Sequence, residues 1–381
     1  MKFKQFLDTL KSYTIIGLIT FLFLEIAFQF SSLEPLQNLP GFNNLYKVSD
    51  RDKFGDSACG SYWWKSQYIQ RYESDRGLMR DARLNDPHPT RGWTPRANLN
   101  VSIGDVTYTT NQQGHRALQD YEPNSERYTI LVVGDSYSFG IDTDDSFLWT
   151  NLLQAKDKRL NIINLGVAGY GLDQIYITLK ETIALYKPNL VIAAFISDDI
   201  FRMRFNFRDY KKPQLKIRGN ELIVSNTPIG NLEETYREVK QELRWKVIPV
   251  VKLDDVLYNL SVSCREVSYK LASKTFLEMQ KISIENEAEF LLTYLASSPE
   301  VENPDHTSYG EKVLQQFIIE NPMTHLNTRP YFLEGNERGE NYHGGHYQKA
   351  ESSLVSNIIY DKITSLDSFH TFIADRIAPS P

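Results

Sequence analysis

The chain has 381 residues, of which 41% are hydrophobic and 24% charged, so it can bury a sizeable core of one large or two ordinary domains. This composition excludes wholesale disorder and fibrous repeats. A formal net charge of −6 and a pI near 5.7 leave no general cation excess for phosphate groups, which argues against a dedicated nucleic-acid-binding protein. A mean hydropathy of −0.40 excludes a polytopic membrane protein but allows a single span.

An apolar run near the N-terminus predicts one membrane-spanning helix. Residues 14–30 read TIIGLITFLFLEIAFQF, which is long enough to cross a hydrocarbon core of about 30 Å. Lysines precede the run and the first downstream charge is Glu34, so residues 1–13 are predicted to be cytoplasmic. The rest of the chain is then periplasmic or extracellular, held by an uncleaved signal anchor. A cleaved signal peptide and a buried helix are the alternatives.

The two cysteines, Cys59 and Cys264, are compatible with a disulfide in an oxidising compartment and equally with buried thiols. Their spacing from histidines does not resemble a zinc site. The acidic cluster Asp142, Asp144 and Asp145 is better explained as the N-terminus of a helix than as a metal site. No metal or other cofactor is therefore predicted.

The order of periodic segments predicts an α/β domain over residues 91–367. Residues 31–90 lack a clear period and are predicted to be a linker and an N-terminal cap. A β-hairpin follows, because residues 99–103 and 106–109 alternate around a Gly-Asp turn. Alternating strands and helices then indicate a parallel sheet with helices on both faces. The strands are predicted at 128–133, 160–165, 189–196 and 290–295, and the helices at 147–155, 172–186 and 350–366.

Residues 205–231 interrupt this alternation. Residues 214–218 and 221–224 flank Gly219-Asn220, which predicts a second hairpin inserted after the third strand, at the mouth of the sheet. Residues 232–287 are predicted to be mostly helical, and residues 368–381 to form a C-terminal tail.

The segment Gly134-Asp135-Ser136 directly follows the first buried strand. In a parallel α/β sheet, the carboxyl ends of the strands carry the ligand site. A serine there, on a turn into a helix, exposes its hydroxyl near helix N-terminal amides that can stabilise an oxyanion. The simpler structural explanation is that Ser136 only caps the helix.

Three further segments have residues suited to the same chemistry. The second strand ends in NLGVAGYG at 164–171, where glycine lets a backbone N–H approach a substrate closely. The third strand ends in FISDDI at 195–200. HGGHY at 343–347 precedes the last helix and can return a histidine to the serine as general base.

The order of these segments resembles the SGNH/GDSL hydrolase family, the flavodoxin-like serine esterases with a three-layer α/β/α domain. The resemblance covers about residues 90–367 and rests on four segments: 134–136, 164–169, 195–199 and 343–346. NQQGHR at 111–116 and the hairpin around Lys212-Pro213 are similar to segments of family members that act on envelope glycans.

The resemblance implies roles for particular residues. Ser136 would be the nucleophile, its own N–H and that of Gly169 would form the oxyanion hole, and His346 would be the base. Substrate binding is expected of three residues that border the two turns, with the aromatic rings stacking on sugars: Asp135, Tyr137 and Tyr170.

Two positions depart from the family pattern. The family has asparagine where this chain has Asp198, whose ionised carboxylate would repel an oxyanion unless it is protonated, turned away or offset by Arg202 or Arg204. The family also has aspartate three residues before the base, where this chain has His343. In an alternative register His343 is the base and Glu340 its carboxylate. A Ser–His dyad is the third option.

These implications predict a membrane-anchored serine esterase that acts on acyl esters, here acetyl esters, of extracytoplasmic glycans. With a sugar hydroxyl as acceptor, the same chemistry gives an O-acyltransferase served by a membrane acyl-donor partner. A non-catalytic glycan-binding or assembly protein is the second class, motivated by Asp198 and His343. A nucleotide-binding protein is disfavoured because no GxGxxG or GxxxxGK[ST] follows a strand. The expected partners are an acylated carbohydrate and the membrane.

Overall fold

The structure is a computed structural model that describes residues 13–21, 23, 62–75, 83–117, 120, 125–244, 263–298, 300–343 and 345–377. Of the predicted membrane span, residues 14–21 and 23 are described, and they are helical. Within the described residues no helix combines the length and the apolar character that a membrane span needs. Cys59 and the side chain of Cys264 lie outside the described part, so the disulfide stays a prediction.

A five-stranded parallel sheet forms the centre of the molecule, in the order β13-β12-β7-β5-β6. Its strands are β5 (Tyr128–Val133), β6 (Leu160–Asn164), β7 (Leu190–Phe195), β12 (Glu289–Tyr294) and β13 (His325–Asn327). The first strand, β5, lies between β6 and β7, so the strand order reverses there. This point of reversal is where ligands bind in open α/β sheets. The prediction of an α/β fold with a parallel sheet is confirmed.

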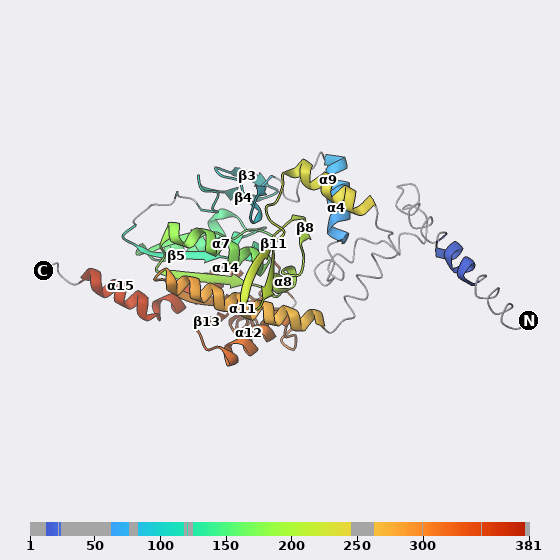
Figure 1. The fold of residues 1–381 in the computed structure, drawn as a ribbon. Helices are drawn as coiled ribbons and strands as arrows, with labels where there is room; N and C mark the ends of the chain where they lie inside the picture. The colour runs from blue at the N-terminus through green and yellow to red at the C-terminus, as the bar shows by residue number, and fades with distance from the viewer. Residues whose placement is uncertain are drawn as a thin grey trace, which may run out of the picture.

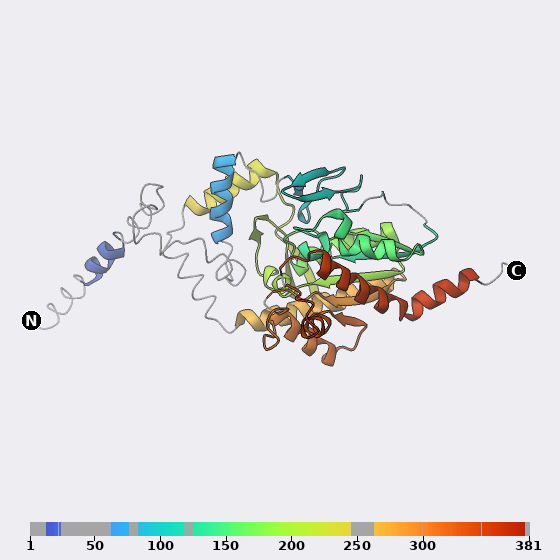
Figure 2. The same ribbon diagram turned by 180° about the vertical axis from the view of Figure 1, so that it is seen from behind.

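Helices cover both faces of the sheet, which makes three layers (Figures 1 and 2). Alternate residues of each strand point to opposite faces, so Phe195 packs on one side and Ile192 on the other. One face carries α7 (Leu172–Tyr186), α11 (Ser263–Glu285) and α12 (Tyr309–Glu320). The other carries α6 (Trp149–Lys156), α13 (Arg329–Glu337), α14 (Lys349–Thr364) and α15 (Asp367–Ile377).

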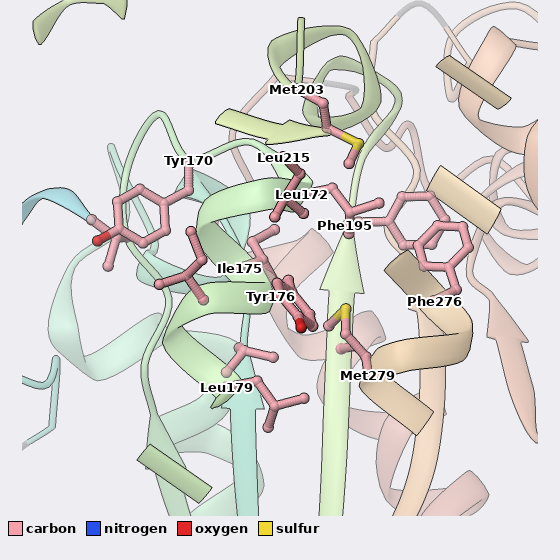
Figure 3. Close-up of a cluster of buried hydrophobic side chains, with 14 of the residues drawn as sticks. Tyr170, Leu172, Ile175, Tyr176, Leu179, Phe195, Met203, Leu215, Phe276 and Met279 are labelled. Atoms are coloured by element: carbon pink, nitrogen blue, oxygen red, sulfur yellow. The ribbon is translucent and has the colours of Figure 1, made fainter. Parts of the chain in front are cut away.

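The face that carries α7, α11 and α12 shows why the strand sequences are continuous apolar runs. In Figure 3, Leu172 and Ile175 of α7 lie beside Phe195 of β7, with Phe276 and Met279 of α11 on the other side. Every residue of β5 and β7 is buried, because both faces of these strands are covered. This packing fixes the carboxyl ends of β5, β6 and β7 relative to one another.

Short hairpins and a helix pair surround the carboxyl edge of the sheet. The hairpins are β1 (Asn85–His88) with β2 (Gly92–Pro95), β3 (Asn100–Ile103) with β4 (Val106–Thr109), β8 (Phe207–Arg208) with β9 (Tyr210–Lys211), and β10 (Gln214–Arg218) with β11 (Glu221–Ser225). The two hairpins predicted from the sequence, β3–β4 and β10–β11, are confirmed. Helix α4 (Tyr62–Asp75) lies beside α9 (Leu232–Arg244), and both figures show the pair to one side of the sheet.

Two terminal regions are more regular than predicted. The linker region 31–90 contains α4, whose Tyr68 hydroxyl donates to the Leu232 carbonyl at 2.8 Å, and also β1. The predicted tail from residue 368 belongs mostly to α15. There Phe369 is buried and packs edge-to-face on Tyr128, with ring centroids 5.1 Å apart. Aromatic side chains of both helices pack against the rest of the domain.

Candidate active site

Ser136 and His346 meet at the carboxyl end of β5. Helix α5 (Ser136–Phe139) begins directly after the strand, and the carboxylate of Asp135 caps it by accepting from the Tyr137 N–H at 3.0 Å. The His346 Nε2 atom lies 3.0 Å from Ser136 Oγ. The His346 Nδ1 atom lies 3.0 Å from Asp142 Oδ2. The three side chains therefore form a continuous hydrogen-bonded row of hydroxyl, imidazole and carboxylate.

Asp142 is held in place by its backbone. The residue has a φ of 61°, a left-handed conformation that aspartate tolerates better than most side chains. Its N–H donates to the Tyr108 hydroxyl at 3.0 Å, and its carbonyl accepts from Gln348 Nε2 at 3.0 Å. These bonds join the loop after α5 to β4 and to the start of α14, so the carboxylate stands beside His346.

The acidic cluster around Asp142 divides into separate roles. Asp144 caps the short 3₁₀ helix η2 (Asp145–Phe147) by accepting from the Ser146 N–H, as the helix N-terminus explanation expects. Hydrogen bonds from Ser146 lower the pKa of Asp144. Asp145 pairs with the buried Arg116 at 3.0 Å. Only Asp142 faces the imidazole, a role that the sequence analysis did not assign to it.

The alternative register of histidine and acid does not fit the structure. The backbone N–H of His343 donates to Glu351 Oε1 at 3.1 Å, and the exposed ring makes no hydrogen bond to Ser136 among the described residues. Glu340 accepts from the Tyr342 hydroxyl and lies 3.5 Å from Arg338 Nε. The turn before α14 thus directs His346, and not His343, toward α5.

Asp198 lies outside the cavity that contains Ser136. It belongs to α8 (Ser197–Arg202), which follows β7, and its side chain is 47% exposed, with Oδ2 3.6 Å from Arg202 Nη2. The buried guanidinium of Arg202 also lies 2.7 Å from Asp199 Oδ1 and 3.4 Å from Asp135 Oδ2. Burial and the Asp135 charge raise the pKa of Asp199, which the Arg202 charge opposes. The charge of Asp198 is therefore offset by Arg202, one of the options that the sequence left open.

Three consecutive carbonyls of the turn after β6 accept hydrogen bonds from side chains. The Ala168 carbonyl accepts from Trp93 Nε1 at 2.9 Å. The Gly169 carbonyl accepts from Arg208 Nη1 at 3.2 Å, and the Tyr170 carbonyl from Arg202 Nη1 at 3.0 Å. The donors come from β2, β8 and α8, so the turn is held from three sides. Trp64 of α4 packs on the Arg208 guanidinium at 5.0 Å and supports this arrangement.

Gly169 is required by this geometry. Its φ is +80°, and a Cβ there would lie 2.8 Å from Arg208 Nη1. Because a trans peptide unit is planar with N–H and C=O on opposite sides, the bond from Trp93 to the Ala168 carbonyl fixes the direction of the Gly169 N–H. Gly169 and Ser136 line the same cavity, the placement that two oxyanion donors need.

The cavity beside Ser136 has a volume of about 130 Å³. Besides Ser136, Gly169 and His346, its walls include Asn85, Trp93, Arg202 and Arg208. A cavity of this size accommodates a short acyl group, and its polar walls suit an ester.

The three residues expected to bind substrate are all buried. Tyr170 is fully buried and donates to the Trp93 carbonyl at 2.5 Å, so its ring has no free face for a sugar. Tyr137 packs against His346, with ring centroids 5.2 Å apart, and burial raises the pKa of its hydroxyl. Asp135 is also buried, where it caps α5 and faces Arg202. These three residues therefore support the site from the protein interior.

Comparisons with known proteins concern the fold. No family model and no curated protein matches the chain. A lipolytic G-D-S-L family protein from Veillonella parvula is 10% identical with a TM-score of 0.38, over 62% of this chain and 99% of that one. The acetyl xylan esterase AlAXEase is 12% identical with a TM-score of 0.38, over 61% and 98%. The esterase EstA from Pseudoalteromonas sp. is 14% identical with a TM-score of 0.37, over 62% and 97%.

In this chain the parallel sheet has a serine directly after its first strand, β5. The carboxylate beside His346 comes from the loop after α5, through Asp142.

Proposed function

We propose that the chain is a serine esterase in which Ser136 attacks acyl esters outside the cytoplasm. One observation carries this proposal: Ser136, His346 and Asp142 are joined by two 3.0 Å contacts at the switch point of the sheet. A buried serine hydroxyl that only caps a helix would not need an imidazole, nor a carboxylate on the far side of that imidazole. The arrangement instead matches the roles of nucleophile, base and orienting acid.

The geometry implies the following steps. His346 Nε2 accepts the Ser136 hydroxyl proton as Oγ attacks the ester carbonyl, and Asp142 holds the Nδ1–H and stabilises the imidazolium. The N–H groups of Ser136 and Gly169 bind the oxyanion, while the Arg202 charge faces the same cavity. The imidazolium then protonates the leaving alcohol, which breaks the ester bond and leaves an acyl-enzyme. Water, deprotonated by His346, releases the acid and restores the serine.

The natural substrate is proposed to be a short acyl ester, such as acetyl, on an extracytoplasmic glycan. The cavity volume of about 130 Å³ supports a short acyl group. The apolar run 14–30, preceded by lysines, supports a tether that holds the enzyme at a membrane surface. Fractionation of cells that express the full chain tests this part separately from the chemistry.

A serine-reactive probe tests the chemistry. The full chain in detergent is treated with a fluorophosphonate and assayed with p-nitrophenyl acetate. We expect labelling that disappears in Ser136→Ala, together with a loss of at least about 10³-fold in kcat/KM. Ser74→Ala, which removes an exposed hydroxyl on α4, is the matched control and keeps both signals. An unlabelled wild-type chain would contradict the proposal.

Water and a sugar hydroxyl are both acceptors for an acyl-enzyme. His346 is 32% exposed, so an acceptor alcohol can reach the imidazole from solvent. Incubating the acyl-enzyme with an oligosaccharide separates the two outcomes, because transfer adds the acyl mass to the sugar whereas hydrolysis releases acid.

A further inference from the structure

One polar side chain of the active-site cavity has no structural task. Asn85 is the first residue of β1 and is 4% exposed, and it lines the cavity together with Ser136 and His346. Its backbone is tied into the hairpin, where it lies opposite Pro95, and its carbonyl accepts from Arg96 Nε at 3.4 Å. The side-chain oxygen Oδ1 is buried and has no hydrogen-bond partner among the described residues.

The other polar side chains from the surrounding elements are used differently. Trp93, Arg202 and Arg208 line the same cavity, and each donates to a backbone carbonyl of the turn after β6. They hold the protein's own chain in place. Asn85 Oδ1, in contrast, accepts no hydrogen bond from the described residues. A buried amide oxygen without a partner lowers stability, so a residue of this kind in a catalytic cavity points to a ligand that completes its hydrogen bonds.

The amide chemistry indicates what that ligand group is. Asparagine carries an acceptor oxygen and two N–H donors on one planar group, which suits a hydroxyl that both donates and accepts. The reacting ester carbonyl only accepts, and the backbone N–H groups of Ser136 and Gly169 already serve it. An acyl methyl group does neither. The complementary group is therefore a free hydroxyl on the alcohol part of the substrate.

We infer that Asn85 binds a hydroxyl neighbouring the scissile ester and so selects partially acylated polyols, sugars above all, over simple esters. The inference rests on the proposed esterase function and names the substrate class of that same cavity. Asn85 makes this contact from β1, outside the segments that the sequence resemblance covers.

The test compares substrate pairs in the full chain. A panel of monoacetylated methyl glycosides is assayed beside their deoxy analogues, each lacking one hydroxyl next to the ester. We expect the wild type to prefer at least one hydroxylated partner by about 10- to 100-fold in kcat/KM. Asn85→Leu should abolish this preference, because it lowers kcat/KM for the hydroxylated partner about 10- to 100-fold more than for the deoxy analogue. Asn85→Ala, which cannot overfill the cavity, should behave in the same way.

The melting temperature is a second readout. If Asn85 had a structural role, replacing it would lower the melting temperature. Because Oδ1 lacks a partner, Asn85→Leu should leave the melting temperature unchanged or raise it. Thr293→Val is the matched control. Its Oγ1 in the core strand β12 is also buried without a partner among the described residues, but it lies away from the cavity. That variant should be at least as stable as the wild type and keep full substrate selectivity.

The outcomes distinguish this inference from the proposed function. If the wild type is not labelled by the fluorophosphonate, the esterase proposal fails and the Asn85 inference fails with it. If labelling depends on Ser136 but the variants keep the hydroxyl preference, or no pair shows one, only the Asn85 inference is overturned. An equal loss on all esters also overturns it, because Asn85 would then serve the reacting carbonyl that all of them share.

Discussion

Asp142 orients the imidazole of His346 from 204 positions away in the chain. The family pattern has this carboxylate three residues before the histidine, where this chain has His343. A triad is defined by the geometry of its groups and not by their order in the sequence, so a carboxylate from another loop can take the role. The Asp142 side chain is 66% exposed, which weakens its electrostatic contribution relative to a buried acid.

Replacing Asp142 therefore tests whether the exposed carboxylate assists catalysis. In Asp142→Asn the amide cannot accept the Nδ1–H with the same charge, and its own N–H favours the wrong tautomer of His346. We expect kcat/KM for p-nitrophenyl acetate to fall by roughly 10- to 1000-fold, with little change in melting temperature.

Asp144→Asn is the control for charge removal in the same loop. It weakens the cap of η2 and should lower stability slightly without a comparable loss of activity. If the two variants retain equal activity, Asp142 has no catalytic task and the site operates as a Ser–His dyad.

The residues of the site differ in how far the sequence reveals them. Ser136, Gly169 and His346 follow recognisable motifs at strand ends or before a helix, and the structure brings them together. Trp93 lies 75 positions from the Ala168 carbonyl that it holds, and no local pattern marks such a partner. No sequence motif marks Asn85 either. What distinguishes it is a buried Oδ1 atom without a hydrogen-bond partner among the described residues, which only the structure reveals.

At the scale of elements, a buried ion pair fastens the insertion after β7 to helix α7. Lys212 and Asp173 are both fully buried, and the Lys212 ammonium donates to the Asp173 carboxylate. The carbonyl oxygens of Arg202, Phe205 and Pro213 lie 3.1, 3.2 and 3.2 Å from the same Nζ atom and share its remaining N–H donors. The pair thereby fixes the chain segment that carries Arg202 and Arg208 into the site. Burial lowers the pKa of Lys212, and the Asp173 charge opposes this shift.

Removing one partner of this pair should lower the free energy of unfolding more than removing both partners. Lys212→Met leaves the Asp173 carboxylate buried without its cation, and we expect the free energy of unfolding to fall by about 3–5 kcal/mol. The double variant Lys212→Met with Asp173→Leu removes both charges and should recover much of that loss. Urea unfolding of the wild type, Lys212→Met, Asp173→Leu and the double variant closes the cycle. A loss under about 1 kcal/mol in Lys212→Met would show that the pair is not what fastens the insertion.

Elements with a clear period were predictable, and elements stabilised mainly by partners were not. Helix α7 and strands β5, β6, β7 and β12 have long apolar patterns, and the structure places them within a residue or two of the predicted bounds. Strand β13 has three residues, too few to show alternation. Helix α4 depends on contacts with distant residues, such as the edge-to-face packing of Tyr68 on Phe207 at 5.3 Å.

At the scale of the whole molecule, the fold keeps two histidines neutral: His88 of the β1–β2 hairpin and His115 of the loop after β4. Burial, with the nearby Arg91 charge, lowers the pKa of His88 and of His115 to about 4. The His88 Nε2 atom lies 2.8 Å from Arg91 Nη2, and His115 Nε2 lies 2.9 Å from the Tyr186 hydroxyl. Protonation of either ring in the folded state works against these surroundings.

Lowering the pH should therefore reduce the free energy of unfolding already at pH values above the range in which carboxylates ordinarily titrate. The folded-state pKa of each histidine, about 4, lies below the unfolded value of 6.5, so the unfolded state binds more protons between these values. Their stabilisation is complete above pH 6.5 and is lost as pH falls toward 4. At pH 5.5 each histidine should add about one proton to the uptake on unfolding.

Asp199, whose pKa burial raises, acts in the opposite sense, but its contribution cancels between variants. Urea unfolding from pH 7.5 to 5 should thus show a shallower pH slope in His88→Asn and in His115→Asn than in the wild type, and equal slopes would contradict the neutral, buried state of these rings.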